Sequence, residues 1–290
     1  MANTITKFKK YIDRLDAVYK NASLTGDLDG DATLVREGAN ANEIIVPKMS
    51  LDGLADYSRN GGYVSGDVTL TNETVAFNYD RGRKFGVDAM DNEETAGVAF
   101  GKLGSEFIRT KVVPEVDAFR FATYAGISGI SKATAGTLST GADVIGALRT
   151  ATSKLDEDEV PFENRILYIT PTLYGLVQDL DTSKSREVLD RFSKIVLVPQ
   201  TRFYTAIDLN DGTTSGEEAG GYAKASAGKD INFFVIQKDA VLQYPKHVVN
   251  KVISPDLNQE SDKWLFFFRE YGLADVYDNK VAGLYLHNKA

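Results

Sequence analysis

Few residues in this chain could do chemistry, because it contains only two histidines, His247 and His287, and no cysteine. A zinc site made of His and Cys ligands cannot be assembled from that set. A Ser-His-Asp triad would depend on one of these histidines, and neither has a Gly-x-Ser-x-Gly context. We therefore interpret both histidines as structural and expect no catalytic residue, no metal site and no cofactor.

The segment from Gly221 to Asp230, with the sequence GYAKASAGKD, superficially resembles a phosphate-binding loop. Six residues separate its outer glycines where the motif has four, and Asp230 stands where a Ser or Thr would bind magnesium. We interpret this segment as a flexible loop.

Two groups of carboxylates are the remaining candidates. Asp residues fill positions one, three and five of a calcium-type loop that begins at Asp27, but its turn position is Ala32 and Glu37 falls one residue early. At most a weak cation site is left. Asp156 to Glu159 are consecutive, so they splay from a helix end, and we expect a solvated acidic cap there instead of a general acid and base.

The composition is that of a globular protein, with 43% hydrophobic and 26% charged residues. No run approaches the roughly 18 apolar residues of a membrane span, so we expect no contact with a membrane. The N-terminus lacks the apolar block of a secretory signal, which predicts synthesis in the cytoplasm. A formal net charge of -8 opposes tight binding to phosphate backbones, but an acidic wall can confine DNA without adhering to it.

Apolar residues near the N-terminus recur at spacings of three and four, which predicts an amphipathic helix. These residues are Ile5, Phe8, Ile12, Leu15 and Tyr19. The helix needs a partner surface, either the core of its own domain or, as an arm, a neighbouring subunit or a scaffold.

A long two-stranded ribbon is predicted next. Glu43 to Lys48 is a short strand, and Val75, Phe77 and Tyr79 share one face of a second strand. An isolated ribbon is only marginally stable in water, so this one must lie on its own domain or on another copy. Where that surface belongs to another copy, the three residues would contact a neighbouring subunit.

The basic end of this ribbon consists of Arg81, Arg83 and Lys84. Arg81 and Arg83 point to the same face of an extended strand, which presents two guanidinium groups for bidentate pairing. We expect all three residues to bind carboxylates on a neighbouring subunit, and the alternative is an exposed charge cluster of little energetic value.

A long helix is predicted from Asp91 to Gly126. Asp91 and Glu94 have the spacing of a capping box, and apolar residues form a stripe beyond them. The helix would be on the order of 50 Å long, with a kink near Pro114.

The second half of the chain predicts a mixed α/β domain, in which a helix at about 142–156 precedes three buried strands at 166–169, 195–198 and 233–236. The insertion 208–230 is rich in small residues, and insertions of this length are usually functional or mobile. Further strands at 264–268, 274–277 and 281–286 close the chain.

Several segments resemble the major capsid proteins of tailed bacteriophages that infect Gram-positive bacteria. They are DRGRKFGVDAMDNEETAGVAF with IRTKVVPEVDAFRFA, then INFFVIQKDAVLQYPKHVVNKVISP, WLFFFREYG and VYDNKVAGLYLH. They follow the same order as in that family and cover most of the chain. The resemblance implies an α+β chain with the Hong Kong ninety-seven-type shell fold.

The resemblance also implies a domain layout. It comprises an N-terminal arm (1–42), an extended β-ribbon loop with flanking strands (43–90), a peripheral domain with a spine helix (91–140), an axial domain (141–248) and strands returning to the peripheral domain (249–290). Such a chain would self-assemble through pentamers and hexamers into the icosahedral head of a virion, made in the cytoplasm of a bacterial host. It would enclose double-stranded DNA without reading its sequence.

Two departures from the family pattern limit what carries over. Some relatives crosslink their shells through a Lys of the extended loop, but 51–83 contains no Lys. Some carry an N-terminal scaffolding region, and about 40 residues before the ribbon leave little room for one, which implies a separate scaffolding protein. A portal and decoration proteins are further implied partners.

Two alternatives remain open from the sequence. The first is the shell of a cellular, encapsulin-like compartment, which shares the fold but encloses enzymes. The second is a hydrolase that uses acidic residues near the axial-domain loop, for which the sequence holds no positive sign.

Overall fold

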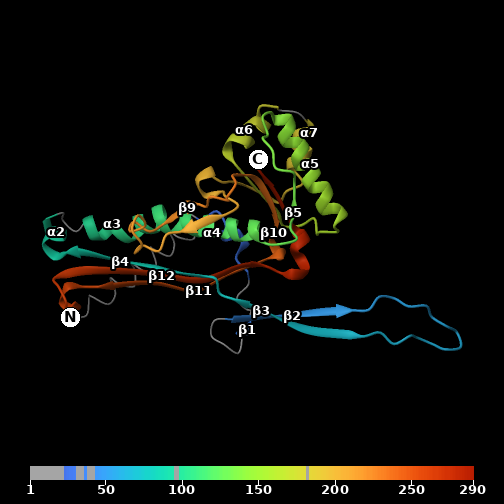
Figure 1. Ribbon diagram of the computed structural model, residues 1–290, viewed down its shortest axis with the longest axis horizontal. Helices are drawn as coiled ribbons and strands as arrows, with labels where there is room; N and C mark the ends of the chain where they lie inside the picture. Colours follow the sequence, from blue (N-terminus) through green and yellow to red (C-terminus); the bar gives the residue numbers. More distant parts are fainter. Residues whose placement is uncertain (1–22, 31–35, 38–42, 95–97, 181–182) are drawn as a thin grey trace.

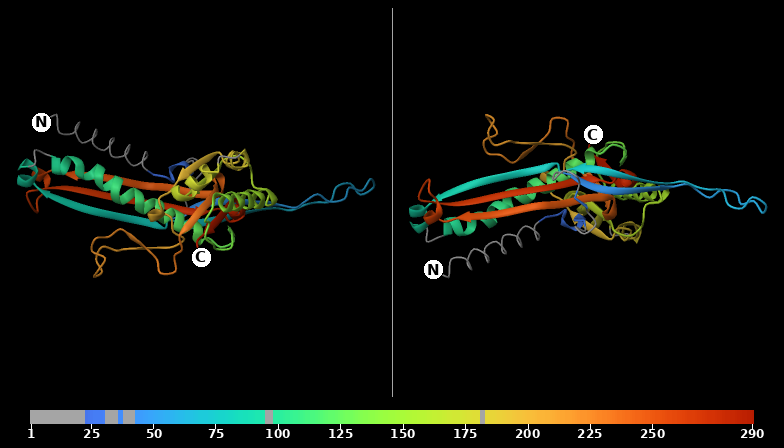
Figure 2. Two further views of the ribbon diagram at one scale, coloured as in Figure 1. Left: turned by 90° about the horizontal axis from the view of Figure 1, so that it is seen from above. Right: turned by 90° about the horizontal axis from the view of Figure 1, so that it is seen from below.

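Two sheets and a long helical segment organise the chain, whose computed structural model describes residues 23–30, 36–37, 43–94, 98–180 and 183–290. A five-stranded sheet with helices on its faces forms a compact lobe, and a three-stranded sheet lies along the helical segment (Figure 1). A hairpin projects from the other end of this body, in the direction opposite to the three-stranded sheet (Figures 1 and 2). The chain is thus a mixture of α and β structure, as the sequence predicts.

The compact lobe is built on a sheet that is buried on both faces. Its strands, in spatial order, are β5 (Ser131–Lys132), β13 (Leu284–Asn288), β10 (Ile231–Gln237), β6 (Arg165–Ile169) and β7 (Lys194–Leu197). Phe233 and Val235 face one hydrophobic cluster, while Phe234 and Ile236 face the other. Burial on both faces explains why this strand is a continuous apolar run instead of an alternating one.

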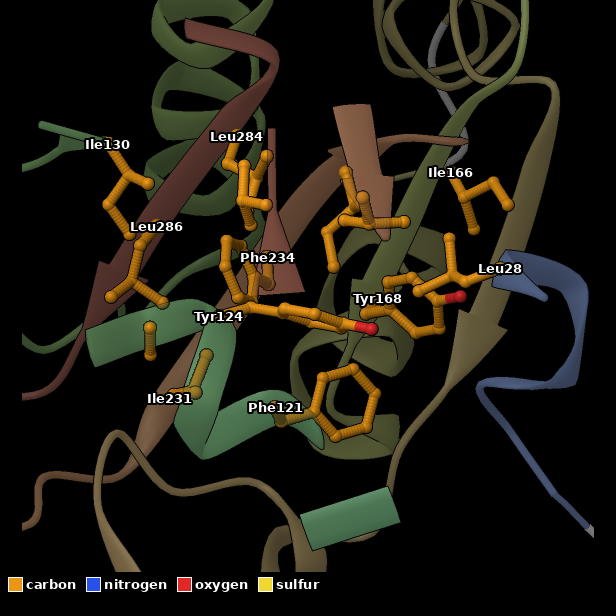
Figure 3. Packing of buried hydrophobic residues seen from close by; sticks show 14 of the residues in the cluster. Leu28, Phe121, Tyr124, Ile130, Ile166, Tyr168, Ile231, Phe234, Leu284 and Leu286 are labelled. Atoms are coloured by element: carbon orange, nitrogen blue, oxygen red, sulfur yellow. The ribbon is translucent and has the colours of Figure 1, made fainter. Parts of the chain in front are cut away.

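Helices cover the two faces of this sheet. One face carries α5 (Gly141–Glu157), α6 (Pro171–Gln178) and α7 (Ser183–Leu189). α5 begins with a capping box in which Thr140 and Asp143 exchange hydrogen bonds. The other face packs on α4 (Val113–Gly126), where Phe121 and Tyr124 lie among the side chains of the strands (Figure 3). The predicted helix and the buried strands at 166–169 and 233–236 are confirmed. β7 is an edge strand with Leu197 exposed, so its predicted burial on both faces is wrong.

The three-stranded sheet has the order β11 (Val241–Ile253), β12 (Lys263–Val276) and β4 (Tyr79–Asp88), all antiparallel. Separate strands were expected at 264–268 and 274–277, but β12 is one strand of 14 residues. Glu270 and Gly272 interrupt its apolar pattern, yet both pair in the ladder, and Glu270 is buried. The expected division of this strand is therefore wrong.

The helical segment, or spine, comprises α2 (Ala89–Glu94), α3 (Val98–Phe107), a π-helical turn (Ile108–Val112) and α4. Its start differs from the prediction, because the helix begins at Ala89, before Asp91, and Asp88 accepts the N–H of Met90. A kink was expected near Pro114, and what the structure has just before this residue is the π-helical turn. Pro114 has no N–H for the ladder, so the wider turn accommodates it.

The projecting hairpin consists of β2 (Glu43–Leu51) and β3 (Val68–Ala76), with β1 (Arg36–Glu37) beside β2. The expected strand through Tyr79 is wrong, because the chain leaves the hairpin after Ala76 and enters the three-stranded sheet at Tyr79. Between them, the Asn78 amide donates to the Ala274 carbonyl and accepts from the Ala274 N–H. This side chain replaces a rung of the ladder where the strand changes sheets.

The expected domain limits stay a prediction, and the observed strand pairing crosses three of them. β13 belongs to the five-stranded sheet, so the chain after Val248 does not return as a whole to the other sheet. β11 starts in the three-stranded sheet at Val241, before the expected boundary at Val248. β5 joins the five-stranded sheet before the expected start of that domain at Gly141.

A buried carboxylate, Asp117 of α4, fastens the segment after the N-terminal region to the spine. Its Oδ1 accepts from the Ser23 hydroxyl (2.9 Å) and from the Thr25 N–H (3.2 Å) and hydroxyl (2.8 Å). Its Oδ2 accepts from the Leu24 N–H (3.1 Å) and from Arg202 Nη1 (3.3 Å). Asp117 is fully buried, so these donors replace its lost hydration.

The network continues from Thr25 into the three-stranded sheet. Arg120 donates to the Thr25 hydroxyl at 2.8 Å. The Gln243 amide of β11 donates to the Thr25 carbonyl and to Asp29 Oδ1, and it accepts from the Tyr124 hydroxyl at 2.8 Å. One polar cluster thus joins the N-terminal segment, the spine and β11.

Asp117→Ala should lower the free energy of unfolding by about 3 kcal/mol, because Arg202 and two buried backbone N–H groups lose their acceptor. Urea unfolding of unassembled subunits, followed by circular dichroism, measures this loss. Glu106→Ala is the matched control, since Glu106 pairs with Arg109 on the exposed side of the same spine. Equal midpoints for the two variants would contradict the anchoring role of Asp117.

Candidate assembly surfaces

The structure separates the six residues expected to contact a neighbouring subunit. Val75 and Tyr79 are 7% and 6% exposed, so their side chains already pack within the chain. Val75 contacts Leu242 and Leu273 in the core at the hairpin base, and Tyr79 packs on Phe119 of the spine. Val75 and Tyr79 are therefore covered by their own chain, and their contact with a neighbour stays a prediction.

Phe77 lies between these two positions and is half-buried. Its ring stacks on Tyr271 with centroids 4.8 Å apart, and the Lys246 ammonium lies 4.9 Å from its centroid. Phe77 therefore packs mainly against its own sheet, and contact with a neighbour stays a prediction for this residue.

Arg81 has its carboxylate within the chain. Its Nε lies 2.8 Å from Glu115 Oε1, which also accepts from the Tyr79 hydroxyl. Burial and the adjacent Glu115 raise the pKa of Tyr79, so the phenol stays protonated and donates. The expected partner of Arg81 on a neighbouring subunit is replaced by Glu115 of the spine, a pairing between distant segments that no local pattern reveals.

Arg83 points to the same side as Arg81, as predicted, but it binds a loop of its own chain. The loop connects β8 (Ile207–Leu209) to β9 (Tyr222–Lys224), and its Glu218 carbonyl accepts from Arg83 Nη2 at 2.8 Å. A Cβ on Gly212 or Gly220 would lie 2.7 or 3.1 Å from Arg83 Nη1. The expected partner was a neighbour's carboxylate, and the observed partners are a carbonyl and a glycine-lined cradle.

Two glycines of the β8–β9 loop, Gly212 and Gly220, thus leave room for the Arg83 guanidinium. Gly212 and Gly220 have φ of 77° and 66°, a conformation that favours glycine. Asp211 accepts hydrogen bonds from the N–H groups of Thr214 and Thr213, which lowers the pKa of its carboxyl well below the usual range. The segment expected to be unstructured is an ordered hairpin with a bound arginine.

This hairpin, β4 and the spine enclose an open groove of about 1120 Å³. Phe85, Phe107 and Phe268 contribute apolar surface, and Lys102 and Lys111 lie on its spine side. Glu106 and Glu115, also in the lining, are paired with Arg109 and Arg81. Among the described residues, no three His, Cys, Asp or Glu side chains gather as a metal site.

The projecting β2–β3 hairpin has one apolar face and one polar face. Met49 lies opposite Leu70 and Leu51 opposite Val68, so these four side chains share a face. Each is about two-thirds exposed. The alternate positions carry Lys48, Ser50, Thr69 and Thr71. The alternation of Met49 and Leu51 with Lys48 and Ser50 is the sequence signal for this surface, and the prediction overlooked it.

The tip of the hairpin, residues 52–67, is also apolar and aromatic. Leu54, Tyr57, Tyr63 and Val64 are exposed, and the rings of Tyr57 and Tyr63 lie 4.9 Å apart. Since no described part of the chain covers this face, the hairpin is an isolated ribbon with exposed apolar surface. Such a surface marks a site of contact with another molecule.

At its base the hairpin is held by an ion cluster. Lys48 Nζ lies 2.8 Å from Glu73 Oε2 and 2.5 Å from Asp278 Oδ2, in the turn after β12. The hydrogen bonds with Asp278 and Glu73 raise the pKa of Lys48. The hairpin therefore includes one lysine, Lys48, which lies outside the lysine-free range 51–83. This lysine already forms ion pairs within its own chain.

Three other sequence candidates, His287, Asp27 and Asp156, have partners within the chain, whereas His247 is exposed on β11. His287 is buried, its Nδ1 lies 3.0 Å from the Asn232 amide, and burial lowers its pKa. Asp27 pairs with Lys194. Asp156 is not merely a solvated cap, because it accepts from the buried Arg165 and from Arg191. The arm residues Ile5, Phe8, Ile12, Leu15 and Tyr19 lie outside the described residues.

Comparisons with known proteins show the fold. No family model and no curated protein matches the chain. The virus-like particle from Pyrococcus furiosus matches at 12% identity and a TM-score of 0.62, over 97% of this chain and 99% of that chain. Gordonia phage Cozz matches at 13% and 0.61, over 92% and 86%, and the capsid of Cyanophage P-SCSP1u at 15% and 0.60, over 93% and 88%.

The chain therefore has the fold of these particle and capsid chains, and the predicted Hong Kong ninety-seven-type α+β fold is confirmed. The structures that it matches are mostly those of tailed-phage capsids. No helix among the described residues is long and apolar enough to cross a membrane.

Gly212→Ala should loosen the β8–β9 hairpin, because it strains the backbone and its Cβ collides with the Arg83 guanidinium. We expect faster amide hydrogen exchange at 207–224 than in the wild type. Gly216→Ala is the control, since Gly216 also has a positive φ, of 92°, but open space around it. The cradle would be refuted if both variants accelerated exchange equally.

Proposed function

We propose that this chain is the major capsid protein of a tailed bacteriophage, the subunit that builds an icosahedral shell around double-stranded DNA. The observation that carries the proposal is the projecting hairpin, whose apolar face is exposed on a body with the fold of capsid chains. A lone subunit leaves this face in water. Burying each Leu or Met of it would contribute about 1.5–3 kcal/mol.

The geometry of the hairpin favours a closed assembly of many copies. The hairpin leaves one end of the body and the three-stranded sheet extends from the other (Figure 2). A contact between one copy's hairpin and the next copy's body is head-to-tail, and such contacts generate rings when the rotation closes. Pentamers and hexamers of this kind are the expected intermediates of the shell.

The cellular-compartment alternative shares the fold, as the match to the Pyrococcus furiosus particle illustrates. We favour the phage shell because most matched structures are phage capsids. A separate scaffolding protein, a portal and decoration proteins remain expected partners. We expect no turnover chemistry, since the chains that this protein resembles form shells.

Electron microscopy and sedimentation of the purified protein test this function. We expect closed shells, either from the chain alone or when it is produced with its neighbouring genes. Particles produced with those genes should hold nuclease-protected double-stranded DNA, whereas a cellular compartment would hold protein cargo. A chain that stays monomeric in both settings would overturn the proposal.

The shell should be held together without covalent crosslinks. The chain has no cysteine, residues 49–76 contain no lysine, and Lys48 is engaged with Glu73 and Asp278. Boiled and reduced particles on a denaturing gel should give a single band near 31.7 kDa. Ladders of linked subunits would show this prediction wrong.

A further inference from the structure

We propose that Asn60, at the tip of the β2–β3 hairpin, is a site of spontaneous deamidation, where the side-chain amide becomes a carboxylate without an enzyme. This modification is independent of the proposed shell function. Three features of the tip favour it, namely the residue that follows Asn60, the hydrogen bonds of the turn and the exposure of both residues.

Asn60 is the one asparagine of the sequence that precedes a glycine. Deamidation begins when the backbone nitrogen of the next residue attacks the carbonyl carbon of the asparagine side chain. A Cβ on that next residue hinders the approach, and Gly61 has none. Asparagine is counted among the thermolabile residues of proteins, and this pair of residues is the least protected one in the chain.

The turn that carries Asn60 does not need a glycine at position 61. Ser58 and Gly62 pair across it through two backbone hydrogen bonds, of 3.2 and 2.7 Å. Gly62 has a φ of 75°, which favours glycine, whereas the φ of Gly61 is not positive. A Cβ on Gly61 would lie 3.5 Å from Ser58, which is an ordinary contact. The turn would therefore accept alanine at position 61, and the fold does not explain the glycine there.

The backbone at Asn60 is not held by the strands of the hairpin. Their ladder ends at the pair Leu51 and Val68, so Asn60 lies well outside it. Both Asn60 and Gly61 are exposed, and the Gly61 N–H donates to the Ser58 hydroxyl at 3.1 Å. Water and hydroxide therefore reach the nitrogen that attacks, and the turn can rotate into the reactive geometry.

Two asparagines elsewhere in the chain show the contrast. The Asn78 amide binds both backbone groups of Ala274, at 2.8 and 3.1 Å, and the Asn210 amide donates to the Gly220 carbonyl at 3.2 Å. Each of these asparagines is also followed by a residue that has a Cβ. We expect both to stay intact while Asn60 converts.

The reaction consumes only water. The Gly61 nitrogen, after loss of its proton, forms a bond to Cγ of Asn60, and the Cγ–Nδ2 bond breaks. Ammonia leaves, and the two residues are joined in a cyclic succinimide. Water then opens the ring at either of its carbonyl groups, which gives aspartate or isoaspartate. No oxidant, reductant or cofactor takes part.

The product changes both the charge and the main chain of the tip. Residues 52–67 hold three aspartates and one arginine, so deamidation adds a fourth carboxylate to an acidic tip. Isoaspartate also leads the main chain through the side-chain carbon, which lengthens the turn between Ser58 and Gly62. Free subunits therefore become heterogeneous with time in the charge and the shape of this tip.

Mass spectrometry of aged protein tests the site. Unassembled subunits are incubated in mildly alkaline buffer and then digested, since another molecule on the tip would shield it. The peptide that contains Asn60 should gain the mass of an amide-to-acid exchange, and ion-exchange chromatography should show a more acidic fraction, as the Asn60→Asp variant does. The peptides that contain Asn78 and Asn210 are internal references and should stay unchanged.

Gly61→Ala is the matched variant, because its turn should fold as in the wild type, which circular dichroism checks. Its Asn60 should convert at least about tenfold more slowly, since the new Cβ hinders the attack. Equal rates in the wild type and in Gly61→Ala would overturn the role of Gly61. An Asn60 peptide that stays unchanged, or that converts no faster than the two references, would overturn the site.

Discussion

The Asp117 carboxylate is the interaction on which the rest of the structure depends. A fully buried charge is tolerated only when hydrogen bonds replace its hydration, and here five donors from the N-terminal segment and Arg202 do so. The same spine helix contributes Phe121 and Tyr124 to the core of the compact lobe. One helix, α4, therefore holds the N-terminal segment, the compact lobe and the three-stranded sheet in place relative to one another.

The body of the molecule fixes the direction in which the hairpin projects. A free two-stranded ribbon is marginally stable and would sample many directions. Its base is packed through Ile44 and Val75 against the ends of β11 and β12, and the Lys48 ion cluster ties it to the turn after β12. The apolar face is thereby held out at a defined angle, so the entropy of orienting it is lost on folding and not again on assembly.

Periodicity alone predicted the two-sided burial of β10, the helix at Gly141–Glu157 and a long helical spine, because these patterns are local. Periodicity failed where the outcome depends on contacts between segments that are far apart in the sequence. Val75 and Tyr79 alternate correctly, but Val75 clusters with Leu273 and Tyr79 pairs with Gly272, each nearly 200 positions away. The binding of Arg83 by the β8–β9 loop could not be predicted from the sequence either. A glycine-rich loop has the composition of a flexible segment whether or not it encloses a guanidinium.

The balance between apolar and charged contacts also bears on how such a shell forms. An interface of great strength would trap subunits that meet in the wrong register, since dissociation would be too slow to correct them. Contacts made of modest apolar area with a few exposed charge pairs are individually weak and reversible. In the proposed shell, each subunit would both give a hairpin and receive one, so closure would leave no such contact unpaired and would itself add stability.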